Sequence, residues 1–302
     1  MRKRTDLWKI VFCVMLGGWI LCTQSVSPVT SNETDDMRAE APLSDPERPA
    51  VDDTVKILFI GNSLTYFNDM PGMVEQLAVT ARKAVVVDQA VVGGVALRNL
   101  VNNPDINARI NANDWDFVAL QSDDITAFPD MYQIEINTLK AFESKILANN
   151  SSTKIIYLMV WGLRDGVTVL ELNGEYVFYS YLDYMLKIYH GALYIADRLD
   201  LLIAPAGWAW RQTRNERPAL ELFSSDKAHP SYRGSYLTAA VYYSVIFKES
   251  CAGIMYNGTL SNDEAYTLRR IGSATVLDSL ELWHLDKPTL IDEPACPSAG
   301  PE

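Results

Sequence analysis

Histidine and cysteine are scarce in this sequence, which limits the chemistry open to the chain. Its 302 residues include three histidines and four cysteines. Cys13 and Cys22 lie near the N-terminus, so only Cys251 and Cys296 remain for the rest of the chain. Without a Cys-x-x-Cys pair or a Cys/His cluster, the chain has no ligands for a structural zinc site. We therefore expect no metal and no cofactor, and at most one disulfide, between Cys251 and Cys296.

Basic residues are also few relative to acidic ones, at 26 against 38, which gives a net charge of −12 at neutral pH. No run of lysine and arginine interrupts this balance. An acidic surface repels phosphate backbones, so we expect no nucleic-acid partner. The remaining composition, 48% hydrophobic and 21% charged, is that of a globular protein. The length then predicts one domain of about 250 residues after a leader.

The N-terminus carries an apolar run at 10–22 behind a basic start, Met1-Arg2-Lys3-Arg4. This run is short for a membrane span but has the length of a signal-peptide core. We expect residues 1–27 to be a signal peptide, with an uncleaved anchor or a lipid on Cys22 as alternatives. The protein is then exported to the periplasm, the cell surface or the medium. Any contact with a membrane would be made through this segment alone.

The rest of the chain divides by composition. Residues 28–53 are polar, acidic and proline-bearing, which predicts a disordered linker. Residues 54–285 form the predicted domain, and 286–302 a C-terminal tail. In the domain, short apolar runs alternate with amphipathic stretches. The predicted strands are 55–60, 84–92, 116–121, 154–160 and 200–204, and the predicted helices are 70–82, 96–112, 130–149, 176–199, 231–248 and 261–281.

This alternation predicts an α/β fold: a three-layer α/β/α sandwich with about five parallel strands, because continuously apolar strands are buried on both faces. Each predicted strand ends in polar or small residues, among them Ser63 after the first and Gly94 after the second. Ligands bind beyond the carboxyl ends of such strands. The fold would therefore gather these residues at one site.

Ser63 is a candidate nucleophile, and a serine nucleophile needs a base. His190 lies in the predicted helix 176–199, and His284 follows the last helix. His229 differs, because Asp226 precedes it by three residues and a proline follows it. Asp226 could hold the Nδ1–H of His229 and leave Nε2 to accept the proton of Ser63. On spacing alone, a turn aspartate beside an unrelated histidine is an equal alternative.

A serine mechanism also needs donors for the oxyanion, each commonly worth about 3 kcal/mol. The candidates are the backbone N–H groups of Ser63 and Gly94 and the side-chain amide of Gln121, which end the first three strands. Candidate substrate contacts are Asn62, Trp161 and Trp208. The segment GNSLT at 61–65 lacks the lysine of a phosphate-binding loop and the second glycine of a lipase-type elbow.

These segments resemble the SGNH (GDSL-type) hydrolases over about residues 55–250. GNSLT at 61–65 is similar to the first block in the form of one branch, Gly94 to the oxyanion glycine, and DKAHPS at 226–231 to the last block. The third block departs, because VALQS at 118–122 stands where the family has Gly-x-Asn-Asp. The resemblance implies a flavodoxin-like sheet and a metal-free Ser-His-Asp hydrolase acting on esters or acetyl esters.

The sequence thus favours an exported serine esterase whose substrate is a small-molecule or glycan ester. Two alternatives stay open. One is an inert domain of the same fold that binds a carbohydrate or a surface partner, and the other is an acyltransferase that uses the same residues.

Overall fold

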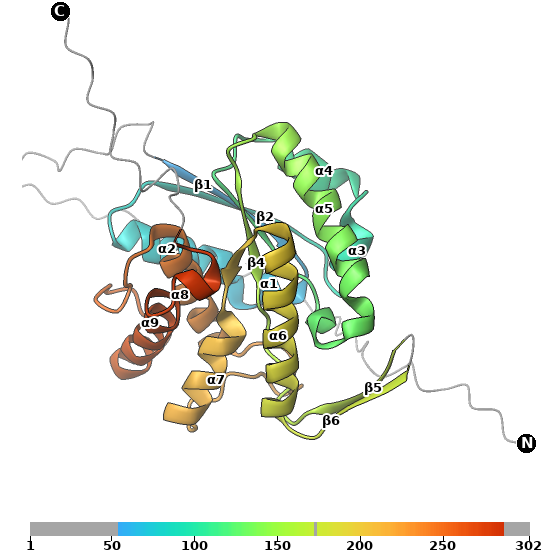
Figure 1. Ribbon diagram of the computed structural model, residues 1–302. Helices are drawn as coiled ribbons and strands as arrows, with labels where there is room; N and C mark the ends of the chain where they lie inside the picture. The colour runs from blue at the N-terminus through green and yellow to red at the C-terminus, as the bar shows by residue number, and fades with distance from the viewer. Residues whose placement is uncertain (1–53, 172–173, 287–302) are drawn as a thin grey trace, which may run out of the picture. The chain divides into compact units, whose positions relative to one another are not determined.

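The computed structural model describes residues 54–171 and 174–286, and Figure 1 shows their arrangement. The predictions for the leader, for the linker and for the C-terminal tail beyond Asp286 lie outside these residues, as does Cys296. Cys251 is buried, with its Sγ 3.3 Å from Ser273 Oγ. In the described residues, no helix combines the length and the apolar composition that crossing a membrane requires.

One parallel sheet of five strands forms the centre of the domain. In space the strands follow the order β2-β1-β3-β4-β7, and each pairs with its neighbour in parallel. This is the flavodoxin-like order: β2 lies on one side of β1, and the later strands β3, β4 and β7 are added on the other side. The strands are β1 Val55–Gly61, β2 Val85–Val91, β3 Phe117–Leu120, β4 Lys154–Leu158 and β7 Leu202–Ala204.

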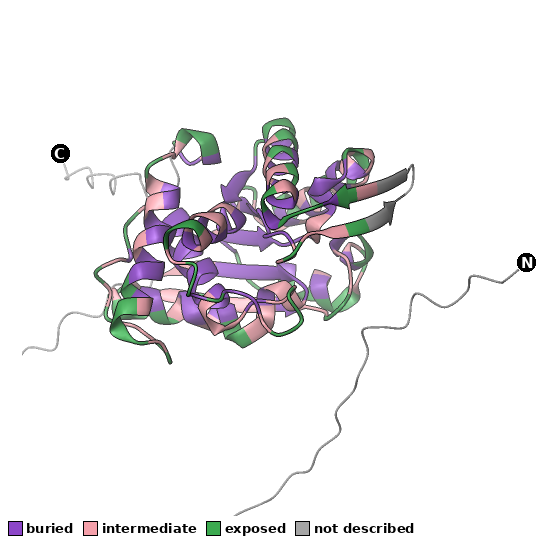
Figure 2. Ribbon diagram, turned by 90° about the horizontal axis from the view of Figure 1, so that it is seen from below, coloured by how far each residue is buried: buried purple, intermediate pink, exposed green. Residues whose placement is uncertain are grey.

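Helices cover both faces of the sheet, so the predicted three-layer sandwich is confirmed (Figure 1). On one face lie α2 Met70–Thr80, α7 Ala206–Glu216, α8 Tyr232–Phe247 and α9 Asn262–Leu277. On the other lie α3 Leu97–Leu100, α4 Pro104–Ile110, α5 Tyr132–Asn149 and α6 Tyr181–Leu199. The buried residues concentrate on the strands and on the helix faces that meet them, as Figure 2 shows. All of β3 and β7 is buried, which accounts for their lack of polar side chains.

Several elements differ from the prediction. The helix predicted over 96–112 is divided into α3 and α4, because Pro104 cannot donate a backbone hydrogen bond and starts a new helix that Asn103 caps. An antiparallel hairpin, β5 Val167–Glu171 and β6 Gly174–Phe178, occupies the start of the helix predicted from 176. That helix, α6, begins at Tyr181 with Ser180 as its cap. Helix α7 was not predicted.

Candidate active site

The turn that carries Ser63 joins the ends of three strands. Ser63 is the first residue of α1 (Ser63–Tyr66), directly after β1, and Asn62 caps this short helix by accepting the Leu64 N–H at 3.1 Å. The Asn62 amide donates to the Val95 carbonyl at 3.2 Å and to Asp123 Oδ1 at 2.8 Å. Asn62 therefore ties the Ser63 turn to the loops after β2 and β3, and both hydrogens of its amide serve this purpose.

Gln121 lies beneath the same turn. Its Oε1 accepts the Asn62 N–H at 2.8 Å and the Thr65 hydroxyl at 2.9 Å, and its Nε2 donates to the Ser122 carbonyl at 2.7 Å. A Cβ on Gly61 would collide with this amide, so only glycine fits there. Gln121 is buried and does not line the pocket around Ser63 that the described residues form. Its predicted contact with an oxyanion thus finds no support in this geometry.

Ser63, His229 and Asp226 are hydrogen-bonded in series, although 166 residues separate the serine from the histidine. Ser63 Oγ lies 2.8 Å from His229 Nε2, and His229 Nδ1 lies 2.6 Å from Asp226 Oδ2. Because a carboxylate oxygen only accepts, we assign the proton of the neutral ring to Nδ1. Nε2 is then free to accept a proton from the Ser63 hydroxyl. The side chain of His229 is 26% exposed, so solvent and substrate can reach it.

The loop around Asp226 keeps this carboxylate ionised. Its Oδ1 accepts hydrogen bonds from the Ser224 hydroxyl at 2.7 Å, the Ala228 N–H at 3.0 Å and the His229 N–H at 2.9 Å. Partial burial raises the pKa of Asp226, but hydrogen bonds from Ala228, Ser224 and His229 outweigh it, and the net pKa is well below the usual range. The negative charge beside His229 therefore persists at neutral pH.

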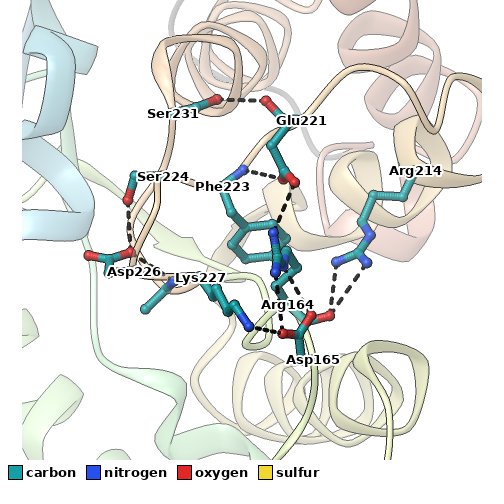
Figure 3. A network of polar contacts seen from close by, with 10 residues as sticks. Arg164, Asp165, Arg214, Glu221, Phe223, Ser224, Asp226, Lys227 and Ser231 are labelled. Carbon is teal, nitrogen blue, oxygen red and sulfur yellow. Dashed lines mark hydrogen bonds and ion pairs between the residues drawn. The ribbon is translucent and has the colours of Figure 1, made fainter.

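A polar network fastens this loop to the segment that follows β4 (Figure 3). The Arg164 N–H donates to the Lys227 carbonyl at 3.1 Å, and Lys227 Nζ lies 2.7 Å from Asp165 Oδ2. Arg164 also pairs with Asp165 and with Glu221, at 3.0 and 3.3 Å. Hydrogen bonds from Arg164 and Lys227 lower the pKa of Asp165 to about 2. The network joins two loops that lie far apart in the sequence and so supports the position of His229.

A pocket of 460 Å³ opens beside Ser63 at the carboxyl edge of the sheet. Among the predicted residues, Asn62, Ser63, Gly94, Trp161 and His229 line it. The backbone of Gly94 has a φ of 69°, a left-handed conformation that glycine adopts without strain.

The two predicted substrate-binding tryptophans lie in different places. Trp161 lines the pocket, donates its indole N–H to the Ala228 carbonyl at 3.0 Å and stacks on Trp210 with 4.1 Å between ring centroids. Trp208 is not among the described residues that line the pocket. It lies in α7 and stacks on Tyr189, with 4.4 Å between the ring centroids. Only Trp161 is therefore placed where it can contact a substrate.

The other two histidines lie elsewhere. His190 is exposed on α6. His284 Nε2 lies 2.9 Å from Asp197 Oδ1, and its Nδ1 lies 3.0 Å from the Leu201 carbonyl oxygen. Of the three histidines, all within the described residues, only His229 lines the Ser63 pocket.

Sequence reasoning missed several polar residues of the pocket. Arg98 and Asn99 of α3 line it together with Asp123 and Asp124, and Arg98 lies 4.0 Å from Asp123. Asp123 and Asp124 directly follow the predicted strand 116–121, which was a signal available in the sequence, whereas Arg98 and Asn99 lie within the predicted helix 96–112 and gave none. Among the described residues, no group of three or more histidine, cysteine, aspartate or glutamate side chains is arranged to hold a metal ion.

The fold and this site define a class: an α/β/α sandwich with serine, histidine and aspartate in hydrogen-bonded series beyond the carboxyl ends of its strands. No protein-family model and no curated protein matches the chain. Several solved structures do match the chain. A DUF4886 family protein from Bacteroides uniformis is 16% identical, with a TM-score of 0.61 over 74% of this chain and 95% of that one. At this TM-score the two proteins share a fold.

Two further solved structures have lower scores. A proposed SGNH hydrolase from Slackia heliotrinireducens is 22% identical, with a TM-score of 0.47 over 63% of this chain and 98% of that one. An acetylxylan esterase from Geobacillus stearothermophilus is 17% identical, with a TM-score of 0.44 over 62% and 92%. A proposed SGNH hydrolase and an acetylxylan esterase thus stand among the solved structures that match this chain.

Proposed function

We propose that the protein is a serine hydrolase that cleaves carboxylic esters. The observation that carries this proposal is the series Ser63 Oγ, His229 Nε2 and Asp226 Oδ2, with separations of 2.8 and 2.6 Å between the interacting atoms, at the edge of a pocket. A serine is a weak nucleophile unless a neighbouring base takes its proton. The persistent charge on Asp226 favours the tautomer of His229 that can do so.

In the proposed reaction, Ser63 Oγ bonds to the carbonyl carbon of the ester while its proton passes to His229 Nε2. Nε2 then donates this proton to the leaving alcohol, and an acyl group remains on Ser63. Water attacks the acyl carbon, gives a proton to Nε2, and the bond to Oγ breaks as Nε2 returns a proton to Ser63.

We propose the backbone N–H groups of Ser63 and Gly94 as donors to the oxyanion. Both residues line the pocket, and a donor aimed at the developing charge is commonly worth about 3 kcal/mol. The Gln121 amide, the third donor predicted from the sequence, is engaged with the Ser122 carbonyl. That bond uses one of the two hydrogens on Nε2, so a second donor remains, but Gln121 is buried outside the lining of the Ser63 pocket and would have to move to take part.

For the substrate we propose an acyl or acetyl ester on a carbohydrate or another polyol. The pocket supports this class, because Trp161 offers a ring edge or face while Asn99 and Asp123 offer polar groups to hydroxyls. We also propose that the protein is exported, on the pattern of the first 27 residues alone, which lie outside the described part of the chain.

Labelling and turnover together test the proposed activity. A fluorophosphonate should label the wild type and not Ser63→Ala. A panel of p-nitrophenyl esters and acetylated oligosaccharides should show a loss of about a thousandfold or more in kcat for Ser63→Ala. Ser152→Ala, at an exposed serine, is the matched control and should leave both unchanged.

An unlabelled wild type without turnover would contradict the proposal and favour an inert binding domain. Faster transfer of the acyl group to a sugar hydroxyl than to water would redefine the enzyme as an acyltransferase.

A further inference from the structure

One face of the His229 imidazole is covered by the ring of Phe67. Phe67 begins the 3-10 helix η2 (Phe67–Asp69), directly after the helix that carries Ser63. The two ring centroids lie 4.3 Å apart with an angle of 14° between the planes, so the rings are stacked. The hydrogen bonds to Ser63 and Asp226 lie at the edge of the imidazole, whereas the contact with Phe67 restrains it across its face.

Phe67 is itself held against the histidine loop. The Ser235 hydroxyl donates to the Phe67 carbonyl at 2.9 Å. The Asn68 amide donates to the Pro230 carbonyl at 3.2 Å and to Ser235 Oγ at 2.9 Å. Asn68 has a φ of 56°, a left-handed conformation that asparagine tolerates better than most residues. These bonds link the segment after Ser63 to the residue after His229 and to the first turn of α8.

Phe67 does not line the 460 Å³ pocket formed by described residues, so a direct contact with substrate is not its role there. Its contact with His229 becomes important when Ser63 is acylated. Oγ is then bonded to the acyl carbon and has no proton to donate, so the hydrogen bond to Nε2 is lost. Of the two residues in the described part of the chain that bond the ring, only Asp226 then remains, and a single hydrogen bond at Nδ1 leaves the ring free to rotate.

We propose that Phe67 is a positioning residue that holds the imidazole of His229 in place while the acyl group is removed from Ser63. The proposal rests on the proposed function. In this step Nε2 takes a proton from the attacking water, the water oxygen bonds to the acyl carbon, and the carbon–Oγ bond breaks as Nε2 returns the proton to Oγ. A misaligned ring slows this step, whereas in acylation the Ser63 hydroxyl itself aligns the ring.

The test is to measure the two steps separately with p-nitrophenyl acetate in a stopped-flow instrument. Phe67→Leu should slow deacylation about fivefold, the factor that about 1 kcal/mol of aromatic stacking represents. It should leave kcat/KM, which reports acylation, nearly unchanged, so the burst of p-nitrophenol grows and kcat and KM fall together. Phe67→Tyr keeps the ring and should restore the wild-type rates.

Asn68→Gly gives a second, independent variant. Glycine adopts the same left-handed backbone, so only the two side-chain hydrogen bonds are lost, and a smaller loss in the same step is expected. Tyr266→Leu, an exposed aromatic on α9, is the matched control and should change neither step.

Each outcome has a distinct meaning. A wild type that fluorophosphonate does not label overturns the proposed function, and the catalytic role of Phe67 with it. A labelled, active wild type whose Phe67→Leu variant deacylates at the normal rate overturns the role of Phe67 alone. Equal slowing of both steps, not rescued by Phe67→Tyr, would also overturn it, because it would reflect a general distortion of the site.

Discussion

At the scale of the residue, the proposed activity depends on one histidine out of three. His229→Ala should abolish turnover, whereas His190→Ala and His284→Ala should leave it nearly unchanged, because neither residue lines the Ser63 pocket formed by described residues. In the wild type, kcat/KM should fall at acid pH, since only the neutral ring of His229 can accept the proton of Ser63. A His229→Ala enzyme that keeps a normal pH profile would assign the base to another residue.

Substitution of Asp226 should lower kcat less than substitution of Ser63 or His229. Asp226→Asn keeps the shape of the side chain but removes the charge that favours the Nδ1–H tautomer of His229. We expect a smaller loss of kcat than for His229→Ala, because a poorly oriented imidazole can still act as a base. Combined with Ser63→Ala, it should cost little more than Ser63→Ala alone. Additive losses in the double variant would show that the two residues act independently.

At the scale of the element, α5 places a buried carboxyl behind the loop after β3. Glu135 accepts hydrogen bonds from Tyr157 at 2.9 Å and Ser122 at 3.1 Å. Burial raises the pKa of Glu135 from 4.5 to about 7, although hydrogen bonds from Tyr157 and Ser122 oppose the shift. Between these values the folded state binds a proton that the unfolded state has released. The free energy of unfolding therefore falls as pH rises through this range.

Glu135→Gln should remove this pH dependence while keeping the size of the side chain and an acceptor for Tyr157. Urea denaturation at a series of pH values gives the measurement. The stability of the wild type relative to the variant should decrease by up to about 3 kcal/mol between pH 4.5 and pH 8, and level off above pH 7. A difference that is constant across this range would mean that Glu135 titrates normally.

Helix α9 begins with a capping box. The Ser261 hydroxyl accepts the Glu264 N–H at 3.3 Å, and Glu264 Oε2 accepts the Ser261 N–H at 3.1 Å. Ser261→Ala should lower the free energy of unfolding by about 1 kcal/mol, since it leaves a helix-terminal donor without this partner. Activity at low temperature should be unchanged. The exposed Ser152→Ala is the control, and equal stability of both variants would show that the cap contributes nothing.

At the scale of the whole molecule, the site is assembled by the crossover connections between parallel strands. The parallel order of β2, β1 and β3 brings the loops after these strands together, and the chain that follows β7 adds the loop that carries His229.

Acyl transfer by serine and histidine needs no metal. We therefore expect EDTA to leave esterase activity unchanged. Loss of activity in EDTA that zinc or manganese restores would overturn the serine mechanism.

Much of this architecture was predictable. The five strands lie within about two residues of their predicted bounds, because continuous apolar runs ending in polar residues are a strong local signal. The hairpin β5–β6 was missed, although an Asn-Gly pair at 173–174 is a typical hairpin signal. An isolated hairpin is marginally stable, and this one is supported by Phe178, which stacks on Tyr184 at 4.2 Å. That contact depends on α6, which local sequence does not place beside it.

Sequence by itself determined the alternation of strands and helices and the edge of the sheet where polar residues gather, and it placed Asp226 and His229 on one short loop. These depend on burial patterns and on neighbours a few residues apart. The tertiary structure alone decided where side chains point. It turned Gln121 under the Ser63 turn, placed Trp208 away from the pocket and stacked Phe67 on His229. The direction of a side chain follows from packing against segments distant in the chain, and these segments become neighbours only when the sheet has formed.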